Sequence, residues 1–469
     1  MRIPVPDVIE PATALGRVHF VGIGGAGLSA IARLMAQQGI AVSGSDANDS
    51  ALLAALRAEG IDARAGHDAG RLEGVDTVIA TTAVREDNPE VVEAQRRGLR
   101  LWPRSAGLQS VLLQGRAVAV AGTHGKTTTT AMLTCALQGA GADPSFAIGA
   151  EVPSLGANAA RGSGDVVVAE ADESDGAFLV YTPHGVVVTN VDADHLDQWG
   201  TEEAYAEAFS TFVGHATGFA VLNADDLAAA RLAGDVGDGV EVLTAGFGAG
   251  ARLRGSDLRV RADGTSFTAR LDDGPAVAVE LAVPGEHYAV DALLALGAGL
   301  LLGHDAAALA DGLATYTGAA RRMQLVGSAG GVRVFDSYAH HPTEIVADLA
   351  AARAIADGDR LVVAYQPHLV SRTRIYGRAM GRALSAADRV VVADLYLARE
   401  DPDPQVTAEL VVAAVDGPPA SAGGPVAGLA AVLLGELRPG DLLLTLGAGD
   451  VTTVGPQVLE ALAAGGPRA

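Results

Sequence analysis

The strongest constraint on the fold is an alternation that repeats along the whole chain. Short apolar runs lead into Gly-rich or polar turns, and a helical pattern follows each turn. Three stretches carry this alternation, and they open with RVHFVGIG (17–24), RAVAVAG (116–122) and GVRVFD (331–336). Alternation of this kind predicts βα units and mostly parallel sheets. We therefore expect an α/β protein.

The length of the chain suits three domains. It has 469 residues, and at roughly 150 residues for an average domain about three are expected. Within the middle stretch, residues 257–283 alternate around Asp263-Gly264 and Asp273-Gly274, which predicts an antiparallel ribbon added to the sheet. The predicted domains are residues 1–115, 116–320 and 321–469.

Charge and cysteine content exclude several classes of function. Acidic residues outnumber basic ones by 56 to 33, for a net charge of −23, so neither a nucleic-acid binder nor a protein of anionic membrane surfaces is expected. The single cysteine, Cys135, excludes an internal disulfide framework. No signal-peptide pattern opens the chain, and apolar stretches such as 292–303 are too short to span a bilayer. We expect a cytoplasmic protein without membrane insertion.

The chain contains one lysine, Lys126, while every other residue among its 33 basic ones is arginine. Lysine offers a compact point charge that the planar guanidinium of arginine does not reproduce. Lys126 lies in AVAGTHGKTTTT (119–130), where an apolar run feeds Gly122-x-x-Gly125-Lys126-Thr127. In such a loop the backbone amides bind phosphates, the lysine neutralises them and the threonine hydroxyl can bind Mg²⁺. The usual P-loop has four residues between its glycines and this one has two, so a Thr-rich helix cap is the alternative.

A second glycine motif lies near the N-terminus. Gly22-Ile23-Gly24-Gly25-Ala26-Gly27 follows an apolar run and precedes a helical pattern, and Asp46 ends the next run. Glycines at this position let the backbone approach a diphosphate, and the acidic residue suits a ribose hydroxyl. The motif alone favours NAD, but the glycines do not decide which nucleotide binds.

Acidic residues follow two apolar runs of the central stretch. DVVVAEADESDGAF (165–178) places Glu170, Asp172, Glu173 and Asp175 after one run, where a P-loop protein holds Mg²⁺ and where a solvated loop is the alternative for some of the four. VVVTNVDADHLDQWG (186–200) places His195 among aspartates after the next. We expect His195 to serve a metal or phosphate site rather than a structural role.

Histidines and arginines cluster in the third stretch. VFDSYAHHPTEI (334–345) brings Asp336, Tyr338, His340, His341 and Glu344 to one turn, where Pro342 and Glu344 also suit the start of a helix. QPHLVSRTR (366–374) contributes arginines, which bind carboxylates and phosphates. Zinc is not expected, because the chain has one cysteine and no histidine pair at helical spacing.

Together these motifs resemble the Mur ligase family over nearly the whole chain. The resemblance rests on HFVGIGGAGLSAIA, GSD, AGTHGKTTTT, EADESDGAFL, TNVDADHLD, Arg321-Arg322, DSYAHHPTEI, QPH with SRTR, LAREDP and LGAGD, in family order. It implies a Rossmann-like N-terminal domain, a central P-loop ATPase domain with the added ribbon, and a Rossmann-like C-terminal α/β domain.

The resemblance also implies a reaction. An ATP-dependent ligase would join L-alanine to the lactyl carboxylate of UDP-N-acetylmuramate through an acyl phosphate, in peptidoglycan synthesis. Mg²⁺, or Mn²⁺ in its place, would assist. The catalytic residues would be Lys126, Glu170 and His195, and the metal ligands Thr127, Glu170 and His195.

The remaining site residues follow from the family motifs. Those expected to bind the UDP-sugar are Gly24, Gly25, Gly27, Asp46, His67, Thr82 and Ala83. Those expected to bind ATP are Gly122, Thr123, His124, Gly125, Lys126, Thr127, Thr128, His287, Arg322 and Asp336. Those expected to bind the amino acid are Tyr338, His340 and Arg372.

Some positions depart from the family pattern. Tyr288 and Asp291 stand where the family has asparagines, Ser337 stands for a frequent aspartate, and Leu369 and Val370 replace an arginine and a tyrosine. These departures affect the adenine and amino-acid contacts. The alternatives are a Mur-like ligase with another acceptor, as in muropeptide recycling, an NAD-dependent dehydrogenase, which explains only the first motif, and a P-loop regulatory switch, which has no use for the third-domain cluster.

Overall fold

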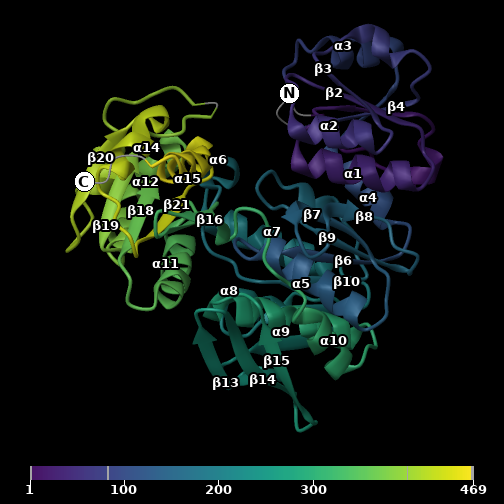
Figure 1. The fold of residues 1–469 in the computed structure, drawn as a ribbon. Coiled ribbons are helices and arrows are strands. Elements are labelled where there is room, and N and C mark those ends of the chain that lie inside the picture. Colours follow the sequence, from purple (N-terminus) through teal and green to yellow (C-terminus); the bar gives the residue numbers. More distant parts are fainter. Residues whose placement is uncertain (1–2, 82–83, 399, 466–469) are drawn as a thin grey trace. The chain divides into compact units, whose positions relative to one another are not determined.

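The computed structural model describes residues 3–81, 84–398 and 400–465. Its strands form three sheets of five, ten and six strands, each accompanied by helices (Figure 1). The α/β architecture predicted from the alternation of apolar runs and helical patterns is thereby confirmed.

The first sheet is wholly parallel, in the order β3-β2-β1-β4-β5. Its central strand VHFV is buried along its full length, because helices cover both faces of such a sheet. Its strands are β1 (Val18–Val21), β2 (Val42–Asp46), β3 (Asp62–Ala65), β4 (Thr77–Ala80) and β5 (Arg100–Pro103). Its helices are α1 (Ala26–Gln37), α2 (Ala51–Ala58), α3 (Pro89–Arg97) and α4 (Arg104–Leu112).

The central sheet has the order β15-β14-β13-β12-β11-β10-β6-β9-β7-β8. Six neighbouring strands of this sheet run parallel, in the order β12-β11-β10-β6-β9-β7. The edge strand β8 is antiparallel to β7. These strands are β6 (Arg116–Ala121), β7 (Ser145–Val152), β8 (Ala157–Ala160), β9 (Val166–Glu170), β10 (Gly185–Val188), β11 (Phe219–Asn223) and β12 (Glu241–Gly246). The helices of this region are α5 (Lys126–Gly139), α6 (Leu196–Trp199), α7 (Glu202–Gly214), α8 (Leu227–Arg231), α9 (Glu286–Leu301) and α10 (Ala306–Leu313).

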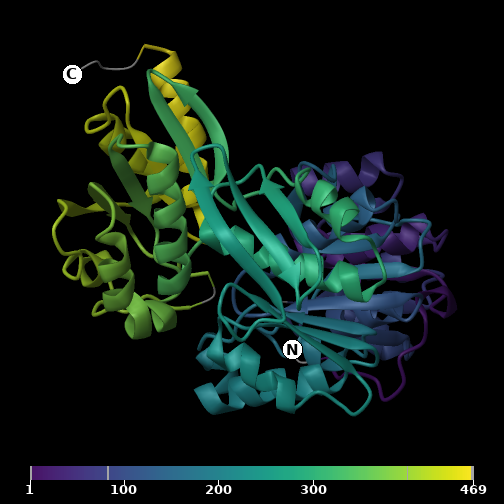
Figure 2. The ribbon, with the colours of Figure 1, turned by 90° about the horizontal axis from the view of Figure 1, so that it is seen from below.

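The outer strands of this sheet form the predicted ribbon, drawn as teal-green arrows in Figures 1 and 2. It consists of β13 (Leu253–Arg261), β14 (Gly264–Leu271) and β15 (Ala276–Leu281). Two residues join β13 to β14 and four join β14 to β15, so these hydrogen-bonded neighbours must run antiparallel.

The third sheet has the order β16-β17-β21-β18-β19-β20, in which β16 is antiparallel and the others are parallel. Its strands are β16 (Gln324–Ala329), β17 (Val332–Ser337), β18 (Leu361–Tyr365), β19 (Arg389–Ala393), β20 (Ala420–Gly424) and β21 (Leu442–Leu446). Its helices are α11 (Pro342–Ala356), α12 (Val370–Leu384), α13 (Ala408–Val412), α14 (Val426–Leu434) and α15 (Val454–Ala463).

Local signals account for several helix boundaries. Thr201 caps α7 by accepting a hydrogen bond from the backbone N–H of Ala204. His341 and Glu344 form a capping box at the start of α11. The apolar pattern predicts a helix from about Ala306 to Tyr316, but α10 ends at Leu313, where the Thr315 hydroxyl donates to the Gly312 carbonyl and competes with helical bonding.

The chain divides into two compact units. One comprises residues 1–257, 267–280 and 290–316 and holds the first sheet and most of the central one; the other comprises 258–266, 281–289 and 317–469 and holds the third sheet. In the part of the chain that the structure describes, every helix is too short or too polar to cross a bilayer.

Candidate active site

The loop between β6 and α5 requires its glycines. Gly122 has a φ of +140°, and a Cβ there would lie 1.8 Å from Thr189 Oγ1. Gly125 has a φ of +82°, and a Cβ there would lie 2.6 Å from Asp291 Oδ1. Only glycine meets both the positive φ and the close approach. The loop therefore exposes backbone amides at the start of a helix, as phosphate binding requires.

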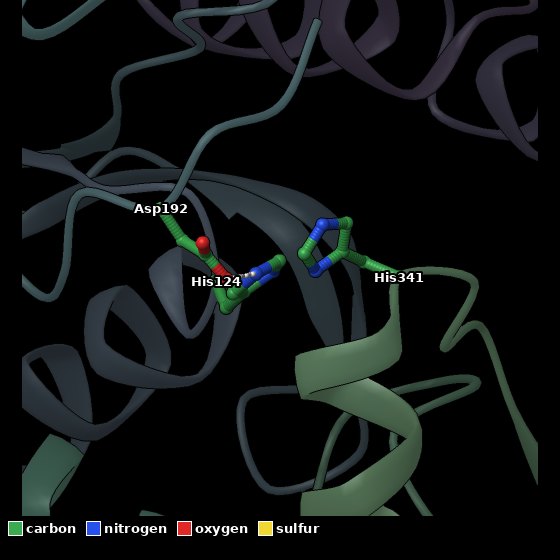
Figure 3. Close-up of side chains that lie close together, drawn as sticks. All are labelled: His124, Asp192 and His341. Carbon is green, nitrogen blue, oxygen red and sulfur yellow. Dashed lines mark ion pairs between the residues drawn. The ribbon is translucent and has the colours of Figure 1, made fainter. Parts of the chain in front are cut away.

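Side chains from the segment after β10 hold this loop in place. Asn190 accepts a hydrogen bond from His124 N at 2.9 Å and donates one to the His124 carbonyl at 3.0 Å. The Thr123 hydroxyl donates to the Asp192 carbonyl at 3.0 Å. His124 Nε2 lies 3.4 Å from Asp192 Oδ2, a pair drawn in Figure 3. The loop is thus fixed in shape by the neighbouring strand end.

Lys126 lies at the centre of the loop. Its Nζ donates to the carbonyls of Gly122 and Thr123 at 2.7 and 3.0 Å and lies 2.9 Å from a carboxylate oxygen of Glu173. Burial opposes the ammonium charge, but the carboxylates of Glu173, Asp172 and Glu170 outweigh it and raise the pKa of Lys126. The lysine therefore carries its charge at neutral pH.

Thr127 and Glu170 form a pair of oxygen ligands beside the lysine. The Thr127 hydroxyl donates to Glu170 Oε2 at 3.0 Å, and Gly149 N donates to the same oxygen at 2.7 Å. A hydroxyl and a carboxylate at this separation are hard donors that suit Mg²⁺. The third expected ligand, His195, instead faces Glu173 and Asp194, with its Nε2 at 3.7 and 3.6 Å from their oxygens.

The first glycine motif forms a tight turn between β1 and α1. Gly24 N donates to Asp46 Oδ2 at 2.9 Å, so the acidic residue at the end of β2 reaches the turn. Gly25 is the N-cap of α1, and Gly27 lies in its first turn. His67 follows β3 and lies 2.8 Å from the Ser45 hydroxyl through its Nδ1. The expected residues Thr82 and Ala83 lie outside the described residues.

Arg104 joins the first sheet to the segment after β9. Its Nη2 donates to Asp172 at 2.9 Å and to Asp175 at 3.2 Å. Burial opposes ionisation of Asp172, but Arg104 and Lys126 outweigh it and lower its pKa. Beside this pair lies a pocket of about 330 Å³. It is lined by Ile3, Val5, Ala80, Thr81, Pro103, Ser105, Asp175, Gly176, Ala177, Val180 and Gln198.

In the third sheet, Asp336 is the next-to-last residue of β17 and contacts Arg321. Its Oδ2 accepts from Arg321 Nε at 3.1 Å and from the Thr452 hydroxyl at 2.8 Å, and its Oδ1 accepts from the Thr445 hydroxyl at 2.6 Å. The Arg322 guanidinium lies 5.5 Å from the centre of the Tyr338 ring. The assignment of Arg322 and Asp336 as ATP contacts stays a prediction.

A row of aromatic rings follows the carboxyl ends of β17, β18 and β19. Tyr338 meets His340 at 5.3 Å between ring centres, His340 meets His368 at 5.7 Å, and His368 stacks on Tyr396 at 5.7 Å. Arg372 is buried in the first turn of α12. Tyr338 and His340 are thus neighbours, as expected.

His287 lies in the first turn of α9, and its ring centre lies 4.1 Å from that of Tyr288, with the two ring planes tilted by 41°. Burial lowers the pKa of His287 to about 4, so the imidazole is neutral at physiological pH. The Tyr288 hydroxyl donates to the Arg322 carbonyl at 3.3 Å. Tyr288, one of the departures from the family pattern, therefore holds the backbone at Arg322.

Sequence reasoning did not assign three residues that shape the phosphate loop. Glu173 pairs with Lys126, Asn190 holds His124, and Asp291 lies against Gly125. The available signal for Asn190 was a polar residue at the end of an apolar run. Glu173 was one of four acids, and only the tertiary fold distinguishes it from Glu170.

Comparison with known proteins covers all three regions of the chain. Three family models match: "Mur ligase family, catalytic domain" at residues 17–116, "Mur ligase middle domain" at 120–299 and "Mur ligase, glutamate ligase domain" at 321–449. A UDP-N-acetylmuramate–L-alanine ligase from Nocardioides sp. is 59% identical, over 98% of this chain and 100% of its own. One from Kineococcus radiotolerans is 50% identical, over 99% and 100%.

Solved structures agree with this comparison. The UDP-N-acetylmuramate–alanine ligase of Thermotoga maritima has a TM-score of 0.81 at 28% identity, covering 96% of this chain and 99% of its own. A murein peptide ligase of Psychrobacter arcticus shares the fold, with a TM-score of 0.71 at 23% identity, over 96% of this chain and 99% of its own.

Proposed function

The chain belongs to the Mur ligase family, and from this premise we propose that it joins L-alanine to the lactyl carboxylate of UDP-N-acetylmuramate, with ATP as the driving substrate. The observation that carries the proposal is the phosphate loop, with Lys126 and the Thr127–Glu170 pair at its base, in a chain 59% identical to a ligase of that name. The product is a precursor of peptidoglycan, and the use of ATP and a UDP-sugar assigns the reaction to the cytoplasm.

Each domain contributes one substrate site in this proposal. Residues 1–115 bind the UDP-sugar through the glycine turn, Asp46 and His67. Residues 116–320 bind ATP at the phosphate loop. Residues 321–469 supply Arg322 and Asp336 to ATP, and Tyr338, His340 and Arg372 to the amino acid.

The reaction has two steps. In the first step, a lactyl carboxylate oxygen attacks the γ-phosphorus of ATP, and the bond from this phosphorus to the β–γ bridging oxygen breaks. ADP departs as the leaving group, and the lactyl carboxylate has become an acyl phosphate. The alanine amine then attacks the acyl carbon, loses a proton, and phosphate departs with the carboxylate oxygen. Lys126 neutralises the negative charge that accumulates on the phosphoryl oxygens.

Thr127 and Glu170 would hold Mg²⁺, and His195 would complete its ligands or position Glu173 beside Lys126. The metal supplies Lewis-acid stabilisation of the phosphoryl oxygens when bound. The backbone amides after Gly122 orient the phosphates, because the loop is held rigid by Asn190 and Thr123.

A screen of ADP release tests this function. Purified protein with ATP and Mg²⁺ is offered UDP-N-acetylmuramate or its peptide-bearing derivatives, each with single amino acids. We expect ADP release only with UDP-N-acetylmuramate, and fastest with L-alanine. ADP release that requires a free peptide as the amine, or that does not depend on which amino acid is present, would assign the chain to another reaction of the family.

A further inference from the structure

Glu90 is a fully buried carboxylate in the first domain that the proposed reaction leaves without a role. It lies in the first turn of α3, with a side-chain exposure of 0%. Burial opposes its ionisation, but hydrogen bonds involving His19, Ser45 and the Asp68 backbone outweigh it and lower the pKa of Glu90 to about 2. A buried ion of this kind needs several donors around it.

The two oxygens of Glu90 face different groups. Oε1 accepts from Asp68 N at 3.1 Å and lies 3.6 Å from His19 Nε2 and 3.8 Å from Arg71 Nη1. Oε2 accepts from the Ser45 hydroxyl and lies 3.2 Å from His67 Nδ1. Ser45 Oγ also lies 2.8 Å from His67 Nδ1. Glu90 Oε2 thus contacts His67 Nδ1 and the Ser45 hydroxyl beside it.

These contacts determine where the proton of His67 lies. An ionised carboxylate only accepts hydrogen bonds, and the single hydroxyl proton of Ser45 goes to it. The remaining lone pairs of Ser45 Oγ and Glu90 Oε2 both face His67 Nδ1. An unprotonated Nδ1 is itself an acceptor, so it would face two other acceptors with no proton between them. Nδ1 therefore carries the proton, and in the neutral ring Nε2 is a hydrogen-bond acceptor.

The order of the sheet indicates which part of a nucleotide reaches His67. The glycine turn after β1 suits the diphosphate, and Asp46 at the end of β2 suits the ribose. In the order β3-β2-β1, the next strand outward is β3, and His67 follows it by two residues. The base therefore extends toward His67, whose side chain is 22% exposed.

We propose that Glu90 and Ser45 fix His67 with its proton on Nδ1, so that Nε2 accepts a hydrogen bond from N3–H of uracil and selects uridine over cytidine nucleotides. The proposal rests on the proposed UDP-sugar site. Uracil presents a donor at N3, whereas cytosine presents an acceptor there, and two facing acceptors repel. Glu90 and Ser45 act as positioning residues, because they reach the nucleotide only through His67.

Binding of UDP and of CDP, measured by calorimetry on the full chain, tests the proposal. The wild type should prefer UDP by at least ~10-fold, the scale of one hydrogen bond to a buried group. Glu90→Gln keeps the shape but can donate to Nδ1, so the preference should fall to within about 3-fold. Glu93→Gln, on the same helix and paired with Arg96, is the matched control and should keep the full preference.

Ser45→Ala should give an intermediate preference, because Glu90 still contacts Nδ1 directly. A merely structural loss would weaken UDP and CDP alike and leave their ratio unchanged. An unchanged ratio in Glu90→Gln, or a wild type that binds CDP within about 3-fold of UDP, would overturn the proposal.

The ¹⁵N resonances of the histidine rings give a measurement that needs no folded Glu90 variant. His67→Asn identifies the His67 signals in the wild-type spectrum. We expect the neutral ring to carry its proton on Nδ1 and to leave Nε2 unprotonated, and the opposite tautomer would refute the inference. If the wild type binds neither UDP nor UDP-N-acetylmuramate, the proposed function itself fails; if it binds both without the stated tautomer, only this inference fails.

Discussion

At the scale of single residues, Lys126 is buried among groups that all accept hydrogen bonds. Its ammonium is enclosed by the carbonyls of Gly122 and Thr123 and the carboxylate of Glu173. A guanidinium is wider and planar and does not fit this arrangement of acceptors. We predict that Lys126→Arg lowers kcat by at least ~100-fold while the melting temperature stays near that of the wild type.

Phosphate release checks this prediction, with Arg116→Lys as the control. Arg116 begins β6 in the same domain and pairs with exposed Asp165, so its replacement should leave kcat unchanged. Near-normal turnover in Lys126→Arg would show that the single lysine has no part in phosphoryl transfer.

Asp46 should govern binding of the UDP-sugar alone. Its carboxylate closes the glycine turn after β1, far along the sequence from the phosphate loop. We predict that Asp46→Asn, which can still accept from Gly24 N, raises the KM for UDP-N-acetylmuramate ~10-fold or more and leaves the KM for ATP unchanged. Asp62→Asn on exposed β3 is the control. A rise confined to the KM for ATP would contradict the assignment of the first domain.

At the scale of elements, the conformation of the phosphate loop depends on two glycines with positive φ. A methyl group at Gly122 would overlap the Thr189 hydroxyl at 1.8 Å. We predict that Gly122→Ala abolishes ADP binding in a calorimetric titration, because the loop must move away from β10. Gly141→Ala changes a glycine of positive φ with open space around it, so binding should persist there. Equal binding in both variants would mean that the loop shape is unimportant.

Elements were predictable from the sequence where their signals are local. The start of α5 at Lys126 and the Thr201 cap of α7 follow from glycine placement and cap chemistry. The choice between Glu170 and Glu173 as partner of Lys126 was not predictable, since both follow the same strand. Their roles depend on how β6, β9 and the Asp194–His195 segment meet, which is a property of tertiary packing.

At the scale of the whole molecule, the lysine count limits the metal chemistry. Lys126 is the only lysine and is enclosed by Glu173 and two carbonyls, so a carbamylated lysine cannot supply a metal ligand. We predict that turnover is independent of added bicarbonate and requires Mg²⁺ or Mn²⁺. Activity assays in bicarbonate-free buffer, with and without added bicarbonate, check this. A several-fold stimulation by bicarbonate would contradict the ligand set of Thr127, Glu170 and His195.

The role of Glu170 as a metal ligand can be tested separately. Glu170 binds the Thr127 hydroxyl and Gly149 N, both next to the phosphate loop. We predict that Glu170→Ala lowers kcat by at least ~100-fold and shifts the Mg²⁺ dependence of phosphate release to higher concentrations. Glu151→Gln changes an exposed carboxylate near the carboxyl end of β7 that pairs with Arg33, and it should leave both unchanged. An unchanged Mg²⁺ curve in Glu170→Ala would place the metal elsewhere.

The central claim is that the chain forms an amide through an acyl phosphate, and oxygen labelling tests it most directly. UDP-N-acetylmuramate with both lactyl carboxylate oxygens replaced by ¹⁸O is incubated with ATP, Mg²⁺ and L-alanine. We predict that each phosphate released carries one ¹⁸O and that the amide product keeps the other. Unlabelled phosphate released together with the amide would contradict it, because the carboxylate oxygen would then never have been bonded to phosphorus.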